Sequence, residues 1–167
     1  MPSSSDTPDR AGTAFSRHDH DVCTADVLDR VEALSADRGV RLTPVRRRTL
    51  EILLEAHRAI GAYDVLERLG AEGYGKQPPV AYRALDFLVD QGFVHRIRRL
   101  NAFTACVHPG EFHTPVFLIC RNCDNVAEAP GDDVHTALVA AGDGLGFTIE
   151  RATLEALGLC PQCQAKQ

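Results

Sequence analysis

Residues 79–95 read Pro-Val-Ala-Tyr-Arg-Ala-Leu-Asp-Phe-Leu-Val-Asp-Gln-Gly-Phe-Val-His, and this stretch decides the fold of the N-terminal half. Its periodicity predicts a helix over residues 79–91, ended by Gly92. One side of that helix is apolar: Val80, Ala84, Phe87 and Leu88. The other side carries Tyr82, Arg83, Asp86 and Asp90. An exposed face that is both aromatic and cationic suits a helix that contacts base edges in the DNA major groove. An ordinary helical bundle is the alternative.

Three further helical patterns precede this helix. The first covers residues 24–38, with Thr24 as N-cap, the second opens at Thr43-Pro44, and the third covers residues 62–71. A loop rich in glycine and proline, residues 73–79, then leads into the fourth helix, so the last two helices read as a helix-turn-helix. Arg46, Arg47 and Arg48 lie in the first turns of the second helix. These arginines would either contact DNA phosphates or form an ordinary solvent-exposed basic face of the helix.

A β-hairpin is expected directly after the helices. Residues 93–99 form its first strand, Asn101 turns the chain, and residues 102–107 return. A hairpin in this position is the wing of a winged helix. Arg96, Arg98 and Arg99 would line the wing and contact the phosphate backbone, which supplies affinity rather than sequence information.

The C-terminal half has a different pattern. Strands are expected over residues 116–119, 125–129 and 147–157, with a helix over 132–141 that buries Val134, Leu138 and Ala141. The fold class is therefore α+β: a winged helix-turn-helix domain followed by a small α/β domain. The expected boundaries are a disordered tail (1–22), the DNA-binding domain (23–107), a hinge (108–114) and the α/β domain (115–167).

Two Cys-x-x-Cys pairs bracket this second half: Cys120 with Cys123, and Cys160 with Cys163. Each spacing lets two thiolates bind one ion, and four thiolates form a closed structural zinc site. Such a site can supply ~10–16 kcal/mol to the folding of a small domain. Two disulfides are the alternative, but the chain opens with no secretory signal, which indicates a reducing, cytoplasmic setting.

The charge and hydropathy of the chain limit the kinds of partner that it can bind. The chain carries a net charge of −5, and residues 101–167 hold 3 basic and 8 acidic side chains, whereas residues 24–100 hold 13 and 11. Any nucleic acid would therefore contact local arginine clusters in the middle block. No apolar run approaches the ~20 residues of a membrane span, so no membrane partner is expected. The tail holds His18, His20 and Cys23, whose role the sequence leaves open.

A second set of possible metal ligands lies near the junction of the halves: His95, Cys106, His108, His113 and Glu128. Two imidazoles, a thiolate and a carboxylate could form a tetrahedral site, and the sulfur favours zinc over harder ions. Scattered surface histidines and one buried cysteine are the alternative. The chain lacks His-Glu-x-x-His and other catalytic zinc motifs, so neither an enzyme nor a small-molecule substrate is expected.

Several separated motifs resemble a known family. They are Leu42-Thr-Pro-Val-Arg46, Ala62-Tyr63-Asp64, Pro79 to Leu85, Gly92 to His95 and the two cysteine pairs. In this order the chain resembles the ferric-uptake-regulator superfamily, and Tyr82 to His95 is most similar to its zinc-uptake-regulator branch. The chain has Val80-Ala81 where the family usually has Thr-Val, and it lacks the His-His-Asp-His run typical of iron-sensing members.

The resemblance implies a zinc-responsive repressor that binds double-stranded operator DNA as a homodimer and controls zinc homeostasis genes. It implies two zinc ions per chain: a structural ion held by Cys120, Cys123, Cys160 and Cys163, and a regulatory ion held by His95, Cys106, His113 and Glu128. Tyr63 and Arg83 would contact DNA, followed by Tyr82 and the Arg46–Arg48 cluster. His108 is a possible substitute for His113, but it ranks second because its spacing to Cys106 is short.

The positions of these ligands suggest a mechanism. Two belong to the DNA-binding half, and two belong to the hinge and the second half, so one ion would fix the angle between the halves. In a dimer that angle sets the distance between recognition helices, which must meet half-sites ~34–36 Å apart. An iron- or peroxide-responsive regulator on the same scaffold is the main alternative, and a zinc-ribbon interaction module is another.

Overall fold

The computed structural model describes residue 15, residues 20–55 and residues 58–166; for residues 20–23 it describes the backbone alone. Six helices and six strands are assigned within these ranges. The N-terminal half contains α1 (His20–Asp37), α2 (Pro44–Leu54), β1 (Ile60–Gly61), α3 (Ala62–Ala71), α4 (Pro78–Asp90), β2 (Val94–Ile97) and β3 (Ala102–Ala105). The C-terminal half contains β4 (Val116–Cys120), β5 (Val126–Ala129), α5 (Asp132–Asp143), β6 (Leu154–Gly158) and α6 (Pro161–Gln164).

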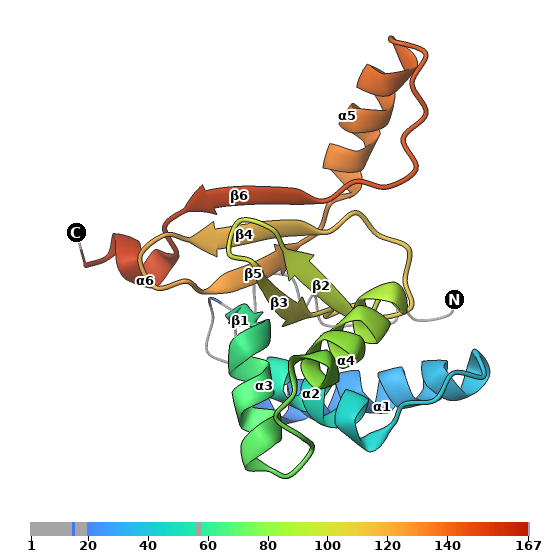
Figure 1. The fold of residues 1–167 in the computed structure, drawn as a ribbon. Coiled ribbons are helices and arrows are strands. Elements are labelled where there is room, and N and C mark those ends of the chain that lie inside the picture. The colour runs from blue at the N-terminus through green and yellow to red at the C-terminus, as the bar shows by residue number, and fades with distance from the viewer. Residues whose placement is uncertain (1–14, 16–19, 56–57, 167) are drawn as a thin grey trace, which may run out of the picture.

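The N-terminal half is a winged helix, as the sequence predicts. Helices α1 to α4 pack together beneath the β2–β3 hairpin (Figure 1). β3 pairs with both β2 and the short strand β1, and all these pairings are antiparallel. The shared core is formed by fully buried residues from the four helices and the hairpin, such as Val31, Leu50, Leu69, Leu85 and Phe93. Burial of such side chains is the main stabilising contribution to this half.

The second half is a three-stranded sheet of order β5-β4-β6. β4 pairs antiparallel with β5 and parallel with β6. A separate apolar cluster joins this sheet to the wing: Ile97 from β2 packs with Phe117, Ile119 and Val126. The two halves therefore meet through a small core of their own.

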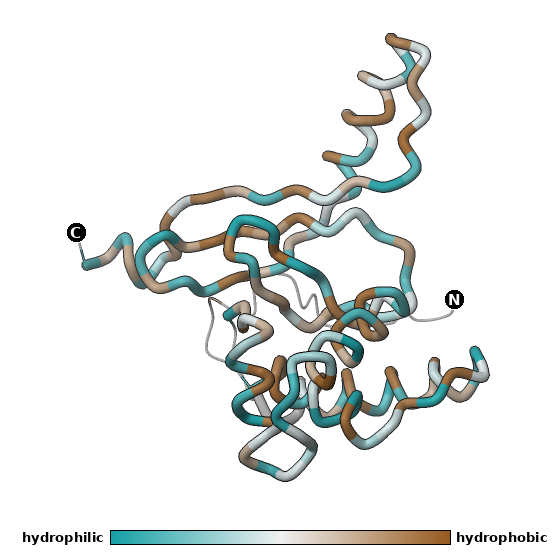
Figure 2. The backbone as a smooth tube through the Cα atoms, viewed as in Figure 1, coloured by the Kyte–Doolittle hydropathy of each residue, from teal (hydrophilic) through white to brown (hydrophobic). Residues whose placement is uncertain are grey.

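Helix α5 projects away from the rest of the chain (Figure 1). Gly142 is its one buried residue, and the apolar residues of α5 and of the following segment are visible along this projection (Figure 2). Leu145 and Phe147 are 86% and 65% exposed. The expectation that α5 buries an apolar stripe is wrong for the single chain: Val134 and Leu138 are half-buried and Ala141 is exposed, because no other described element covers the helix.

Several boundaries differ from the sequence prediction. α1 begins at His20, inside the expected tail, so Thr24 is not its N-cap. The strand expected over residues 147–157 is confined to Leu154–Gly158, because only these residues pair with β4. The inward face of α4 is formed by Ala81, Ala84, Leu85 and Leu88, while Val80 and Phe87 are half-buried at its edge. The sequence does not predict β1 or α6, because β1 has only 2 residues and α6 only 4, which is too short for a recognisable periodicity.

No helix that the structure describes has the length and apolar content needed to cross a bilayer.

Candidate metal centre

Four side chains from both halves converge at the junction between the wing and the second sheet. One donor atom from each of His95, Cys106, His113 and Glu128 lies within 4.8 Å of every other. His113 Nε2 is 2.7 Å from Glu128 Oε1 and 3.7 Å from Cys106 Sγ, and His95 Nε2 is 3.6 Å from Glu128 Oε1. The structure thus brings together the four residues that the resemblance implies.

Each member of this junction cluster is positioned by a different part of the chain. His95 lies on β2, Cys106 follows β3, His113 lies in the connecting loop, and Glu128 lies on β5. The Glu111 carbonyl lies 2.8 Å from His113 Nδ1, which leaves Nε2 facing the cluster. The backbone N–H of Val107 donates to the other oxygen of Glu128 at 3.3 Å. These contacts orient the side chains toward one point.

His108 is not a member of the cluster. Its Nδ1 lies 4.0 Å from the Glu111 carboxylate, and its ring centroid is 6.2 Å from that of His113. Among the residues that the structure describes, the hinge therefore contributes His113 rather than His108.

The charges of the junction cluster are complementary. Burial lowers the pKa of His95, but its contacts with Cys106 and Glu128 outweigh burial and raise that pKa to about 9. Hydrogen bonds to Cys106 and Glu128 raise the pKa of His113 to about 11. Burial opposes ionisation of Glu128, yet the two imidazoles lower its pKa to about 2, and they also lower the pKa of the Cys106 thiol. The protein thus favours a thiolate and a carboxylate in the same place.

This donor set fits a divalent ion. A thiolate and a carboxylate together carry the charge that balances a dication, and the two imidazoles, which would lose their protons when the ion binds, would complete a tetrahedral zinc site. Two donor atoms, His95 Nε2 and Glu128 Oε1, are buried and have no hydrogen-bond partner outside the contacts among these four side chains. Buried polar atoms without partners are costly, and a bound ion would satisfy both.

The second cluster is formed by the two cysteine pairs. The four sulfurs of Cys120, Cys123, Cys160 and Cys163 lie within 4.8 Å of one another, and the Cys123 and Cys160 sulfurs are 3.8 Å apart. These cysteines are free thiols, as is Cys106, so the disulfide alternative is not what the structure shows. A hydrogen bond from the Cys160 backbone lowers the pKa of Cys120 to about 6. Phe15 and Leu159 pack against this four-cysteine cluster.

The candidate DNA-contacting residues Tyr63, Tyr82 and Arg83 lie on exposed parts of α3 and α4. Tyr63, at the start of α3, is 78% exposed and Tyr82 on α4 is 53% exposed. Arg83 is also exposed. The helix face that the sequence assigns to DNA is therefore free of the protein core.

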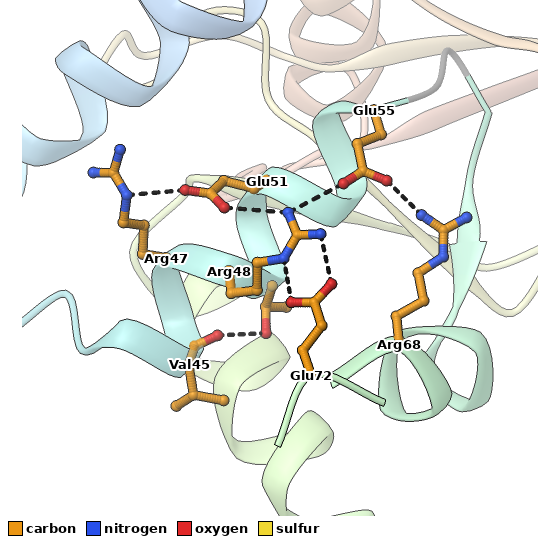
Figure 3. Close-up of polar contacts among 8 residues, drawn as sticks. Val45, Arg47, Arg48, Glu51, Glu55, Arg68 and Glu72 are labelled. Carbon is orange, nitrogen blue, oxygen red and sulfur yellow. Dashed lines mark hydrogen bonds and ion pairs between the residues drawn. The ribbon is translucent and has the colours of Figure 1, made fainter. Parts of the chain in front are cut away.

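Arg46, Arg47 and Arg48 are engaged within the chain instead. Arg48 binds Glu72 with two hydrogen bonds of 2.6 and 2.7 Å and also contacts Glu51 and Glu55 (Figure 3). Its hydrogen bonds to Glu72 raise the pKa of Arg48. Arg47 pairs with Glu32 and Glu51. Arg46 stacks on the Phe87 ring, 3.6 Å from its centroid.

These contacts tie α2 to its neighbours, through Arg48 to the end of α3 and through Arg47 to α1. The sequence signal, three adjacent arginines, gave no indication of this, because Glu72 and Glu32 lie far away along the chain. The sequence does not predict the role of Glu111 for another reason: it contacts His113 through its backbone carbonyl, a group that every residue type has.

The fold and the two clusters define a winged-helix protein with two groups of side chains that could each hold a metal ion. The sequence matches no protein-family profile. It is 36% identical over 141 residues to the zinc uptake regulation protein of Escherichia coli (strain K12), a match that covers 84% of this chain and 82% of that protein. A solved zinc uptake regulator complexed with zinc and DNA has a TM-score of 0.81 at 35% identity, covering 86% of this chain and 96% of that one.

A third comparison distinguishes two arrangements of one relative. Holo XcZur has a TM-score of 0.76 at 40% identity, over 85% of this chain and 99% of that one, whereas apo XcZur has a TM-score of 0.51 at 39% identity. At nearly equal identity, the arrangement of this chain is thus more similar to the holo form. The chain belongs to the zinc uptake regulator (Zur) family.

Proposed function

We propose that this protein is a zinc-responsive transcriptional repressor that binds operator DNA as a dimer and controls zinc uptake and homeostasis genes. The observation that carries the proposal is the junction cluster, whose donors come from both halves of the chain. The relatives support it, since one is a zinc uptake regulation protein and another was solved with zinc and DNA.

The junction cluster is the proposed regulatory site. His95 and Cys106 belong to the wing, and His113 and Glu128 belong to the hinge and the second sheet. An ion held by all four would tie the wing to the sheet and so favour one angle between the halves. A ligand that binds one arrangement better shifts the population toward it, and by linkage operator DNA then raises metal affinity equally.

The four-cysteine cluster is the proposed structural zinc site, so the expected content is two ions per chain. Three of its cysteines are buried. The cluster closes the chain from the end of β4 to the end of β6, and it has no open position for a substrate. It therefore contributes stability to the second half rather than a response to metal.

The dimer is proposed from α5. Leu145 and Phe147, in the segment that follows α5, are exposed in the single chain, and Leu118 and Leu157 on the second sheet are 39% and 46% exposed. Large apolar side chains left exposed in this half indicate an interface, and a second copy of the chain would cover those around α5. The proposed division is a tail that ends before α1, a DNA-binding domain over 20–107, a hinge over 108–114 and a dimerisation domain over 115–167, in a cytoplasmic protein.

DNA recognition is assigned to α3 and α4. Tyr63, Tyr82 and Arg83 would contact the operator, and the wing arginines would contact phosphates. The Arg46–Arg48 cluster would support the helices, because its guanidinium groups already have partners within the chain.

An iron- or peroxide-responsive regulator is not favoured. Such a role suits harder ligands, and the junction cluster contains a buried thiol, Cys106, whose sulfur favours zinc. The catalytic alternative fails on the same site, since four protein side chains leave no open position.

A metal-titrated gel shift tests the proposal. The apo-protein would be titrated with zinc, iron and manganese in the presence of operator fragments, and zinc should support binding at the lowest free concentration. Cys106→Ser should keep the fold and the dimer but lose this response. His108→Ala is the matched control, because His108 lies outside the cluster; it should respond like the wild type. A zinc response that survives Cys106→Ser would reject the assignment.

A further inference from the structure

One row of the second sheet carries two carboxylates on either side of a buried ring. Phe117 on β4 pairs with Glu128 on β5 and with Glu155 on β6. Directly paired residues on neighbouring strands project from the same face of a sheet. Phe117 is fully buried against the wing, so both carboxylates face the wing as well.

The Glu155 carboxylate binds the turn of the wing. One oxygen accepts a hydrogen bond from the backbone N–H of Arg98 at 2.7 Å, and the other accepts one from Arg99 at 3.0 Å. Two consecutive N–H groups that converge on one anion form a strong, charge-assisted contact. Asn101, with a φ of 46°, closes the turn, and Leu100 packs against the apolar cluster beneath it.

Strand β2 therefore runs across this row of residues, from the Glu128 carboxylate at its start to the Glu155 carboxylate at the turn that follows it. His95 contacts Glu128 and lies 5.3 Å from the Phe117 ring, Ile97 packs in the same cluster, and the residues that follow contact Glu155. Three residues of extended chain span ~10 Å, and strands two places apart in a sheet are also separated by ~10 Å. The geometry of the two sheets matches this double attachment.

We propose that Glu155 is a positioning residue that clasps the wing turn to the second sheet without metal. This inference rests on the proposed function, in which the angle between wing and sheet controls operator binding. An attachment at His95 alone would leave the wing able to pivot about that point. With Glu155 as a second attachment, closure of the junction cluster at one end of β2 fixes the direction of the whole wing.

The clasp also explains how the wing reaches DNA. Glu155 uses backbone N–H groups, so the side chains of Arg98 and Arg99 stay exposed. The carboxylate therefore fixes the turn and leaves both guanidinium groups available for phosphate.

Amide hydrogen exchange tests the clasp independently of DNA. In the zinc-loaded protein, Glu155→Ala should raise the exchange rates of the Arg98 and Arg99 amides by about tenfold or more, as expected for the loss of charge-assisted hydrogen bonds. Glu155→Gln keeps the side-chain volume but only one acceptor oxygen, so one of the two amides should exchange faster. Glu150→Ala, which removes an exposed carboxylate before β6, should leave both rates unchanged. Wild-type exchange at both amides in Glu155→Gln would overturn the clasp, even if Glu155→Ala failed to fold.

Operator binding tests the consequence. Glu155→Gln should bind as much zinc as the wild type but bind the operator several-fold more weakly at saturating zinc. Faster exchange with unchanged operator affinity would overturn the role of the clasp in DNA binding. Failure of the wild-type protein to bind DNA in zinc would instead overturn the proposed function, whatever the exchange rates show.

Discussion

The substitution Ile97→Ala should uncouple the two halves of the chain. Ile97 is fully buried, and it is the one fully buried residue that the described part of the winged half contributes to the apolar cluster between the halves, here called the junction core (Ile97, Phe117, Ile119 and Val126). Truncation of a buried isoleucine to alanine costs ~2–5 kcal/mol. This core has only four buried members, so its neighbours can partly collapse into the space, and we expect ~2–3 kcal/mol. A loss of that size lowers the docking constant of the halves on the order of 30- to 150-fold.

The matched control is Ile52→Ala. Ile52 is equally buried but belongs to the helical core beneath the wing. Both variants remove the same atoms and should lose comparable free energy of unfolding in urea. At a temperature where both remain folded, Ile97→Ala should bind the operator at least tenfold more weakly in saturating zinc, while Ile52→Ala should bind like the wild type. Equal operator affinities for the two variants would refute a docking role for the junction core.

Three further predictions probe other parts of the molecule. Arg83→Ala should weaken operator binding by ~1–3 kcal/mol and relax its sequence specificity, as expected for the loss of a base contact, whereas Arg48→Ala should lower the melting temperature and leave operator affinity and specificity unchanged; the reverse pattern would return Arg48 to the DNA interface. Gly110→Ala should weaken zinc binding at the junction, because Gly110 has a φ of 85° and an added Cβ would lie 2.7 Å from a Leu34 methyl carbon. Leu34→Ala in the same chain should partly restore zinc binding. If Gly110→Ala bound zinc as tightly as the wild type, the result would contradict this packing. Cys160→Ser should remove the tightly held zinc and most of the secondary structure of the second half, measured by metal analysis and circular dichroism, and a stable dimer without that zinc would contradict a structural role.

The sequence predicted those features that depend on neighbouring residues. Helix α3 was placed over residues 62–71 because Gly61 precedes it and a turn-rich loop follows it, and both ends agree with the structure. The cysteine pairs were recognised because a Cys-x-x-Cys spacing is itself a local chelating turn. The helices around Tyr63 and Arg83 were assigned from their periodicity.

Features that depend on register were beyond the sequence. Glu128 and Glu155 share a row only because β4 pairs with both β5 and β6, and no local pattern encodes that alignment. The long strand expected from residue 147 was wrong for a related reason: its first residues have apolar side chains but no partner strand. Likewise, the carboxylates around Arg48 come from the later turns of its own helix and from the distant end of α3.

The most direct measurement replaces one donor from each half in turn and follows zinc content and operator binding together. If one ion is held jointly at the junction, His95→Ala and His113→Ala should each lose the same single zinc per chain, retain the other, and lose zinc-dependent operator binding to the same extent. Zinc-dependent operator binding that survives either substitution would contradict a shared site, and with it the idea that metal sets the angle of the wing.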